Sequence, residues 1–446
     1  MTEVTDYNKS VTFASLADTG AAPTNSMQPF PDLNAMPQNA FDTLKERGFI
    51  AQVTDESGIR TLLETEKITF YIGFDPTASS LHCGSLVPIM AMAQLQHGGH
   101  KPVGLVGGGT AMVGDPSGKT EMRQMLSFDT ISANGDAILG QLKRYLTLDG
   151  SAGMAANNAD WLLKLNYIDF LREIGRHFRV NEMIRADAYR ARLEREEGLS
   201  FIEFNYQLLQ GYDFLMLYER HGCRLQMGGD DQWSNILAGT DLIRRKHGKQ
   251  AFCITFPLLT TARGEKMGKT AGGAVWLDAA RTSPYEFYQY WINTDDRDVA
   301  RFLALFTFLP MDEIARLGAA EGADLNHSKQ VLAYETTCLC HGKAAADDAR
   351  AGSRAAFGDG GDATAMPTTQ ISGVRLGEGI SLLDLFVETG LAPSKGEARR
   401  LIQQGGAYVN DEAAGEVSAR VGAGDLKNGA IVLRAGKKKI HRLVAV

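Results

Sequence analysis

Alternation between apolar and polar positions marks several short strands in the first 260 residues. The clearest is KITFYIGF (67–74), in which isoleucine and phenylalanine alternate with threonine and tyrosine until glycine and proline interrupt the run. Similar apolar runs occupy 101–109, 223–227 and 252–259, and segments with helical spacing separate them. This order of strands and helices predicts an α/β fold with a doubly wound, mostly parallel, Rossmann-like sheet.

The same periodicity divides the chain into five parts. Residues 1–37 are polar and proline-rich without periodicity, and we expect a disordered extension. The Rossmann-like domain spans 38–270. An α-helical domain is expected over 271–357, with a wholly helical pattern from Ser283. The composition of 358–370 predicts a linker. Residues 371–446 show short helices followed by a basic pair of strands, which predicts a small α+β domain.

One helical segment is unusually apolar and lies in an insertion around 157–200. Its sequence NADWLLKLNYIDFLREIGRHF is typical of protein core or of a subunit interface. The apolar positions are Trp161, Leu162, Leu165, Ile168, Leu171 and Phe178.

Glycine-rich turns follow three of the predicted strands and carry charged residues. HCGS places His82 and Gly84 where a strand turns into a helix, and backbone N–H groups at such a helix start favour phosphate. GDPSGKT brings Asp115 and Lys119 to the second turn, and GGDDQW forms the third. The alternatives are an ordinary strand–turn–helix with an exposed histidine for the first turn and a solvated turn of mixed charge for the second.

The helix predicted over 201–221 carries a polar stripe. Tyr206, Gln210 and Asp213 stand at positions i, i+4 and i+7, so they share one face of a helix that is otherwise mostly apolar. The stripe is either solvated or lines a polar pocket. We favour the pocket because tyrosine and aspartate supply a hydrogen-bond donor and an acceptor.

Two further patterns connect these turns to a known family. HCGS and, roughly 180 residues later, KMGKT (266–270) resemble the HIGH and KMSKS signatures of class I aminoacyl-tRNA synthetases. The stretches YIGFDPTASSLH, GDPSGK, YQLLQGYD and QMGGDDQW occur in the order found in the bacterial-type tyrosyl-tRNA synthetase family, which the chain resembles from about Phe41 to Val446. The last unit is similar to a small RNA-binding domain shared with a ribosomal small-subunit protein. Ser85 replaces the second signature histidine, whereas both signature lysines of KMGKT are present.

The resemblance implies activation of L-tyrosine by ATP with Mg²⁺, followed by transfer of tyrosine to tRNA(Tyr). It also implies a homodimer formed through the 157–200 insertion and an anticodon-side role for 271–357. No protein-bound metal is expected. The residues that it implies for the reaction are His82, Thr77, Lys119, Arg123, Lys266, Lys269 and Thr270. Those implied for tyrosine are Tyr71, Asp115, Tyr206, Gln210, Asp213 and Gln232. Those implied for ATP are Asp75, Gly84, Asp231 and Lys269.

Charge and composition refine this picture. The formal net charge is −7, but residues 371–446 hold 11 Lys and Arg against 8 Asp and Glu, so the small domain is basic and the rest acidic. A local polyanion contact fits this distribution. The RNA-binding candidates are Lys395, Arg399, Arg400, Lys437, Lys438 and Lys439.

The cysteines, the apolar runs and the N-terminal segment bear on the compartment. The five cysteines show no paired CxxC pattern and no even disulfide framework. No apolar run has membrane-spanning length, and the N-terminal segment lacks the features of a signal or transit peptide. These features predict a cytoplasmic protein without a membrane partner.

Two alternative functions remain open from sequence. The first is a sister synthetase of the same fold that acts on tryptophan. Tyr71 and Asp213 argue against this alternative. A non-catalytic RNA-binding relative is the other, and intact His82, Lys119 and Lys266 argue against it.

Overall fold

The structure is a computed structural model of the 446-residue chain. It describes residues 39–117, 126–194, 198–270, 273–357, 366–410, 412–427, 429–436 and 439–446. The extension expected over 1–37 and most of the expected linker lie outside the described residues. No helix in the described part of the chain is long and apolar enough to cross a membrane.

A six-stranded sheet forms the first part of the chain, in the order β1-β6-β5-β2-β3-β4. Every neighbouring pair is parallel except β1 and β6, which are antiparallel. The predicted doubly wound α/β sheet is therefore confirmed, with one antiparallel edge strand added. The strands are β1 (Gln52–Val53), β2 (Thr69–Phe74), β3 (Lys101–Val106), β4 (Met154–Asn157), β5 (Leu225–Gly229) and β6 (Phe252–Phe256).

Strand β2 occupies the centre of this sheet and pairs on both sides. Tyr71 lies opposite Val103 of β3 and opposite Gln226 of β5. The chain runs outward through β3 and β4 on one side and through β5 and β6 on the other, so the strand order reverses between β2 and β5. In open α/β sheets, this reversal places a ligand crevice at the carboxyl ends of the two strands.

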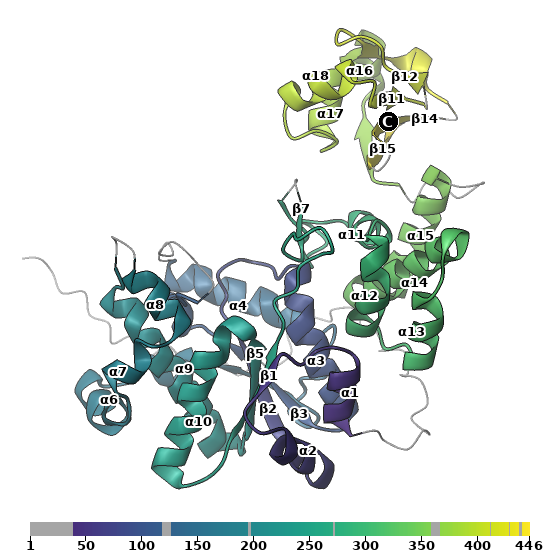
Figure 1. Cartoon of the computed structure of the whole chain (residues 1–446). Helices are drawn as coiled ribbons and strands as arrows, with labels where there is room; N and C mark the ends of the chain where they lie inside the picture. The colour runs from purple at the N-terminus through teal and green to yellow at the C-terminus, as the bar shows by residue number, and fades with distance from the viewer. Residues whose placement is uncertain are drawn as a thin grey trace, which may run out of the picture. The chain divides into compact units, whose positions relative to one another are not determined.

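Helices cover both faces of the sheet (Figure 1). Phe70 and Ile72 of β2 belong to the core packed against α1, α2 and α3, whereas Tyr71 belongs to the core beneath α9 and α10. This division follows the two-residue alternation of a strand. The helices are α1 (Ala40–Glu46), α2 (Glu56–Thr65), α3 (Leu86–His97), α4 (Phe128–Leu142), α9 (Phe201–His221) and α10 (Trp233–His247).

Helix α9 begins and ends at well-defined caps. The Ser200 hydroxyl accepts a hydrogen bond from the Glu203 N–H while the Glu203 carboxylate accepts one from the Ser200 N–H, forming a capping box. Gly222 ends the helix with φ 62°, a left-handed conformation that glycine adopts without steric cost. The helix that carries the polar stripe is therefore closed by hydrogen bonds at both ends.

The insertion before α9 is a series of short helices. Ile168 is 59% exposed and Leu171 is 37% exposed, so the expected apolar surface is present in part. Trp161 is only 5% exposed, so this position belongs to the protein core, which is the other expectation for the segment. The helices are α5 (Ala159–Leu162), α6 (Tyr167–Glu173), α7 (Val180–Met183) and α8 (Asp187–Leu193).

The helices expected from Ser283 onward are observed, beginning with α11 at Pro284. Trp291 packs against Phe302 and Phe306 in the core that also contains α1 to α3, and the Arg47 guanidinium donates to the carbonyls of Ala304 and Thr307, each at 3.0 Å. A two-stranded ladder of β7 (Lys269–Thr270) and β8 (Gly273–Ala274) precedes these helices. The helices are α11 (Pro284–Ile292), α12 (Val299–Phe306), α13 (Met311–Gly318), α14 (Gly322–His341) and α15 (Lys343–Phe357).

The last part of the chain has its own core and two small sheets. The larger sheet has the order β12-β11-β14-β15-β9, and the smaller pairs β10 with β13. The basic strand pair expected at the end is the antiparallel ladder of β14 and β15. The helices are α16 (Gly373–Glu378), α17 (Leu382–Glu388) and α18 (Lys395–Gln403). The strands are β9 (Thr368–Ile371), β10 (Ile380–Ser381), β11 (Ala407–Val409), β12 (Glu412–Ala413), β13 (Arg420–Val421), β14 (Ala430–Ala435) and β15 (Lys439–Ala445).

Candidate active site

A cavity of about 490 Å³ opens at the carboxyl ends of β2 and β5, where the strand order reverses. It brings together most of the residues that the sequence singled out, although they come from separate turns and from α9. Gly84 does not line the cavity, whereas its neighbour Ser85 does. The expected residues on the wall are Tyr71, Asp75, Thr77, His82, Asp115, Tyr206, Gln210, Asp213, Asp231 and Gln232.

Asp213 lies at the deep end of the cavity and is only 2% exposed. Its two carboxylate oxygens accept different hydrogen bonds, one from Trp161 Nε1 at 2.7 Å and one from Asn158 Nδ2 at 2.9 Å. Burial raises the pKa of Asp213 to about 7, although both hydrogen bonds favour the carboxylate. The two donors fix the orientation of the carboxylate.

Tyr71 completes this end of the cavity. Its ring packs edge to face on Phe214, with the ring centroids 5.3 Å apart. Its buried hydroxyl has no hydrogen-bond partner among the described residues. Burial raises its pKa well above the ordinary value, and the nearby Asp213 adds to this effect. A neutral hydroxyl and a carboxylate thus stand together where a polar ligand group could satisfy both.

A chain of hydrogen bonds runs from Asp213 toward the opening of the cavity. Asn158 Nδ2 also donates to Thr110 Oγ1 at 2.9 Å, and the Thr110 hydroxyl donates to Asp75 Oδ1 at 2.7 Å. The Tyr206 hydroxyl of α9 donates to the other oxygen of Asp75 at 2.9 Å. This chain couples the polar stripe of α9 to the turn after β2.

Asp115 forms a second acidic position on the same wall. It accepts hydrogen bonds from Gln232 Nε2 at 2.7 Å and from the Ser117 N–H at 2.9 Å. Its pKa is raised to about 6, mainly by burial and in part by the nearby Asp75 carboxylate. Two carboxylates near one another in a buried wall suit a cationic ligand group.

The HCGS turn and the KMGKT segment touch through their backbones. The His82 Nδ1 accepts a hydrogen bond from the Gly84 N–H at 3.0 Å. A Cβ at Gly84 would lie 2.7 Å from the His82 ring, and a Cβ at Gly268 would lie 2.7 Å from the Gly84 nitrogen. Gly268 also has φ +77°, so glycine is required there for conformation as well as for space.

Trp276 lies between the HCGS turn and a cation. It forms a β-bridge with His82 and meets the His82 ring edge to face, with ring centroids 6.2 Å apart. The Arg281 guanidinium stacks over the indole ring at 3.4 Å from its centroid. The segment that follows KMGKT is thereby joined to the wall of the cavity.

Several expected site residues cannot be placed. Lys119 and Arg123 lie outside the described residues, as do Lys437 and Lys438. Lys269 and Thr270 are described as strand β7, but their side chains are not. In the part of the chain that the structure describes, no cluster of three or more His, Cys, Asp or Glu side chains could hold a metal ion.

The RNA-binding candidates that the structure describes in the small domain are exposed. Lys395 pairs with Asp384 at 2.5 Å and Arg400 pairs with Glu397 at 2.7 Å, and both basic side chains are largely exposed. Arg399 and Lys439 are exposed as well.

The sequence did not indicate Thr110, Asn158 and Trp276, which line the cavity, or the hydrogen bond from Trp161 to Asp213. The sequence left Trp161 as core or subunit interface. The structure buries its ring and also directs its N–H to Asp213, a contact that the sequence did not indicate. A signal was present, because Asn158 and Trp161 carry polar groups within an apolar run next to β4. A buried tryptophan N–H requires an acceptor, and that requirement could have suggested a carboxylate partner.

Comparison with known proteins agrees with this geometry. The family model of class I tRNA synthetases (W and Y) matches residues 63–358, and that of the tyrosine–tRNA ligase SYY-like C-terminal domain matches 361–443. A tyrosine–tRNA ligase of Desulfosudis oleivorans is 56% identical over 424 residues, covering 90% of this chain and 98% of that protein. One of Clostridium tetani is 54% identical, covering 92% of this chain and all of that protein.

A solved structure of similar fold is a C-terminally truncated mitochondrial tyrosyl-tRNA synthetase of Aspergillus nidulans. It is 31% identical, with a TM-score of 0.65, and the match covers 72% of this chain and 94% of that one. The family models, the relatives and the fold converge, and the chain belongs to the class I tRNA synthetases for tryptophan and tyrosine, within the tyrosine–tRNA ligase family.

Proposed function

We propose that this chain uses ATP to convert L-tyrosine to tyrosyl-adenylate and then transfers the tyrosyl group to the 3′ end of tRNA(Tyr). In the first step, a tyrosine carboxylate oxygen attacks the α-phosphorus, and the bond to the bridging oxygen breaks to release pyrophosphate. In the second step, a terminal ribose hydroxyl of the tRNA attacks the tyrosyl carbonyl and displaces AMP. The observation that carries this proposal is that the Tyr71 hydroxyl and the Asp213 carboxylate lie near each other at the deep end of the cavity.

Tyr71 and Asp213 would recognise the phenolic hydroxyl. Trp161 and Asn158 each occupy one carboxylate oxygen of Asp213, and each oxygen has a further lone pair that can accept the phenol proton. The unpartnered Tyr71 hydroxyl would donate to the phenol oxygen. Phenylalanine would leave both groups buried and unpaired, which is costly.

The polar stripe of α9 would hold the amino-acid end of the substrate. Asp115, Tyr206 and Gln210 would hold the ammonium group, and Gln232 would lie near the carboxylate. Asp115 and Gln232 already contact each other at 2.7 Å, so these two positions are coupled. The attacking carboxylate is nucleophilic without deprotonation, so alignment rather than a general base would dominate the first step.

The turns after β2 and β5 would bind ATP. Asp75, Gly84 and Asp231 would hold the ribose and the adenylate, and His82 and Thr77 would contact the γ-phosphate. We infer that Mg²⁺ enters bound to ATP, because the triphosphate oxygens are the hard ligands that this ion prefers. The cations expected to stabilise the departing pyrophosphate are Lys119, Arg123, Lys266 and Lys269, with Thr270 beside them.

The remaining parts of the chain would serve tRNA binding and assembly. The division into 38–270, 271–357 and 371–446 would give a catalytic, an anticodon-side and an RNA-binding domain. Lys395, Arg399 and Arg400 would contact the phosphate backbone, together with Lys437, Lys438 and Lys439. The exposed Ile168 and Leu171 would meet a second copy in a homodimer. We place the enzyme in the cytoplasm.

The tryptophan-specific and non-catalytic alternatives are disfavoured for stated reasons. An indole has no hydroxyl to satisfy Tyr71 and Asp213 together, and the relatives reported above are tyrosine–tRNA ligases. A protein that only bound RNA would have no use for a buried polar pocket of this kind beneath the HCGS turn.

The experiment that tests the whole reaction is charging of tRNA(Tyr) with labelled tyrosine by the full chain and by a chain ending near residue 360. We expect the shortened chain to form adenylate normally but to lose charging, because the basic domain is removed. Equal charging by both would refute the assigned RNA-binding role, and no charging by the full chain would refute the function.

A further inference from the structure

A short hairpin leads into the KMGKT segment and carries Lys266. The Met267 N–H donates to the Leu259 carbonyl at 3.0 Å and the Thr261 N–H donates to the Glu265 carbonyl at 2.8 Å. These bonds flank the bridge between Thr260 and Lys266, which makes that pair non-hydrogen-bonded. The two side chains are therefore close cross-strand neighbours, and the Thr260 carbonyl points outward from the hairpin.

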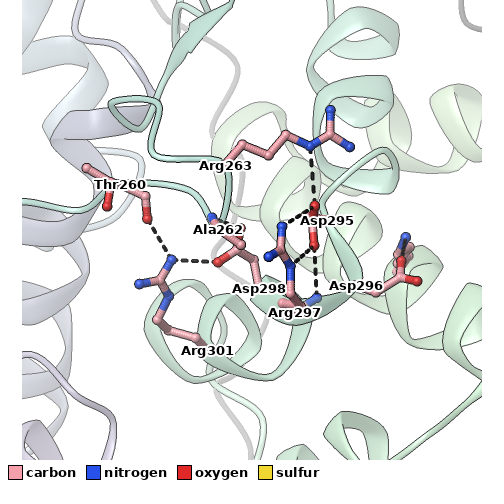
Figure 2. A network of polar contacts seen from close by, with 9 residues as sticks. Thr260, Ala262, Arg263, Asp295, Asp296, Arg297, Asp298 and Arg301 are labelled. Carbon is pink, nitrogen blue, oxygen red and sulfur yellow. Dashed lines mark hydrogen bonds and ion pairs between the residues drawn. The ribbon is translucent and has the colours of Figure 1, made fainter.

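The outer edge of this hairpin is bound by the segment that joins α11 to α12 and by the first turn of α12 (Figure 2). Asp298 is 2% exposed and lies just before α12. One oxygen of its carboxylate accepts the Ala262 N–H at 2.7 Å, and the other accepts Arg301 Nη2 at 2.6 Å. The same Arg301 nitrogen donates to the Thr260 carbonyl at 2.7 Å. Asp298 and Arg301 thus hold the outgoing strand and the turn together.

A second contact lies beside the first but is weaker. Arg263 Nε donates to Asp295 at 3.2 Å, and Asp295 also pairs with Arg297. Both arginine side chains are more than 60% exposed, so solvent screens this pair. The buried carboxylate of Asp298 is the stronger attachment.

The return strand of the hairpin is held on its other side. Met267 is 4% exposed, and the Gly268 N–H donates to the Tyr290 hydroxyl at 3.2 Å. Gly268 also packs against Gly84 of the HCGS turn. Met267 and Gly268, the residues that follow Lys266 on this strand, are therefore anchored beside the wall of the cavity, whereas the Lys266 side chain is exposed.

We propose that Asp298, acting through Arg301 and Thr260, is a positioning residue that holds Lys266 in place for the reaction with ATP. The inference rests on the proposed role of Lys266 at the pyrophosphate. A cation stabilises a leaving group only if it is already aimed at the developing charge, and displacement of a group by about 1 Å can cost a hundredfold in rate. A buried carboxylate pinning two backbone groups supplies that constraint.

The test compares Asp298→Asn with a matched control. Asparagine can still accept the Ala262 N–H, but its amide NH₂ opposes the donors of Arg301. Asp296→Asn is the control, because Asp296 lies two residues away and its recorded partner is Lys329 in α14, not the hairpin. We expect Asp298→Asn to slow single-turnover adenylate formation about tenfold to a hundredfold, with unchanged tyrosine affinity and thermal midpoint close to the control. If Asp298→Asn does not fold, Arg301→Gln carries the same test.

A double-mutant cycle with Lys266→Ala separates positioning from general stability. If Asp298 acts through Lys266, Asp298→Asn has little further effect on the rate once Lys266 is alanine. Independent, multiplying losses would overturn the proposal, as would a wild-type rate in Asp298→Asn. Failure of the wild-type protein to form adenylate from tyrosine would instead refute the proposed function.

Discussion

Replacing Asp213 by alanine tests the assigned tyrosine pocket most sharply among single substitutions. The carboxylate is 2% exposed, its two oxygens are oriented by Trp161 and Asn158, and it lies beside Tyr71 at the deep end of the cavity. Asp213→Ala removes the proposed acceptor for the phenol, and it leaves the Trp161 N–H without its partner. Tyrosine activation should therefore fall far more than ATP binding does.

The magnitude follows from these contacts. A hydrogen bond to a charged group contributes about 1.5–3 kcal/mol, which corresponds to roughly a 10- to 150-fold loss in kcat/KM for tyrosine. The orphaned Trp161 N–H costs a further ~1–3 kcal/mol of folding stability. ATP does not contact this end of the pocket in the proposed arrangement, so its dissociation constant should stay unchanged.

Stability at different pH provides an independent check on Asp213. Burial raises its pKa to about 7. Because the folded state keeps a proton that the unfolded state releases at lower pH, this group lowers the free energy of unfolding as pH rises from about 4 to 7. Asp213→Asn, which cannot titrate, should remove that contribution.

The assay is rapid-quench measurement of tyrosyl-adenylate over a range of tyrosine concentrations at saturating ATP, with Gln210→Ala as a comparison from the same face of α9. A near-normal KM for tyrosine in Asp213→Ala would refute the reasoning. An equal loss of ATP affinity would also contradict it.

Three other predictions follow from the same arrangement. Lys269→Ala should slow adenylate formation with little loss of tyrosine affinity, since a cation acting on pyrophosphate works mainly in the transition state; single-turnover kinetics with equilibrium tyrosine binding checks this, and an equal loss of tyrosine affinity contradicts it. Tyrosine should bind more tightly as pH rises through about 6, because below that pH Asp115, whose pKa is raised, is protonated and does not attract the substrate ammonium group. Calorimetric titration should show a weaker pH dependence in Asp115→Asn, and a flat wild-type profile would argue against this role. The protein should sediment as a dimer at micromolar concentration and Ile168→Asp should shift it toward monomer, because the 59% exposed Ile168 is assigned to the subunit interface; a wild-type monomer rejects the dimer.

The sheet was predictable because its central strands are short runs of apolar residues that are buried by helices on both faces of the sheet. The run at 67–74 and the apolar runs at 101 and 252 gave β2, β3 and β6 with boundaries close to those observed. Strands β1 and β4 were missed. The first has two residues, and β4 is the sequence MAAN, whose small, half-buried side chains give little alternation.

The site was predictable where chemistry is written in local motifs. The turns after β2 and β5 and the stripe of α9 pointed to residues that the structure gathers on one cavity. Contacts between distant segments were not visible in the sequence. Trp161 was one position of an apolar segment expected in the core or at a subunit interface, and its hydrogen bond to Asp213 spans 52 positions. Asp298 is one of three acidic residues just before α12, and only the fold brings it to Ala262.

The most direct measurement of the central claim is exchange of labelled pyrophosphate into ATP, dependent on added amino acid. We expect rapid exchange with tyrosine and exchange near background with phenylalanine or tryptophan, because neither of these satisfies both Tyr71 and Asp213. Exchange driven as well by phenylalanine or tryptophan as by tyrosine would contradict it.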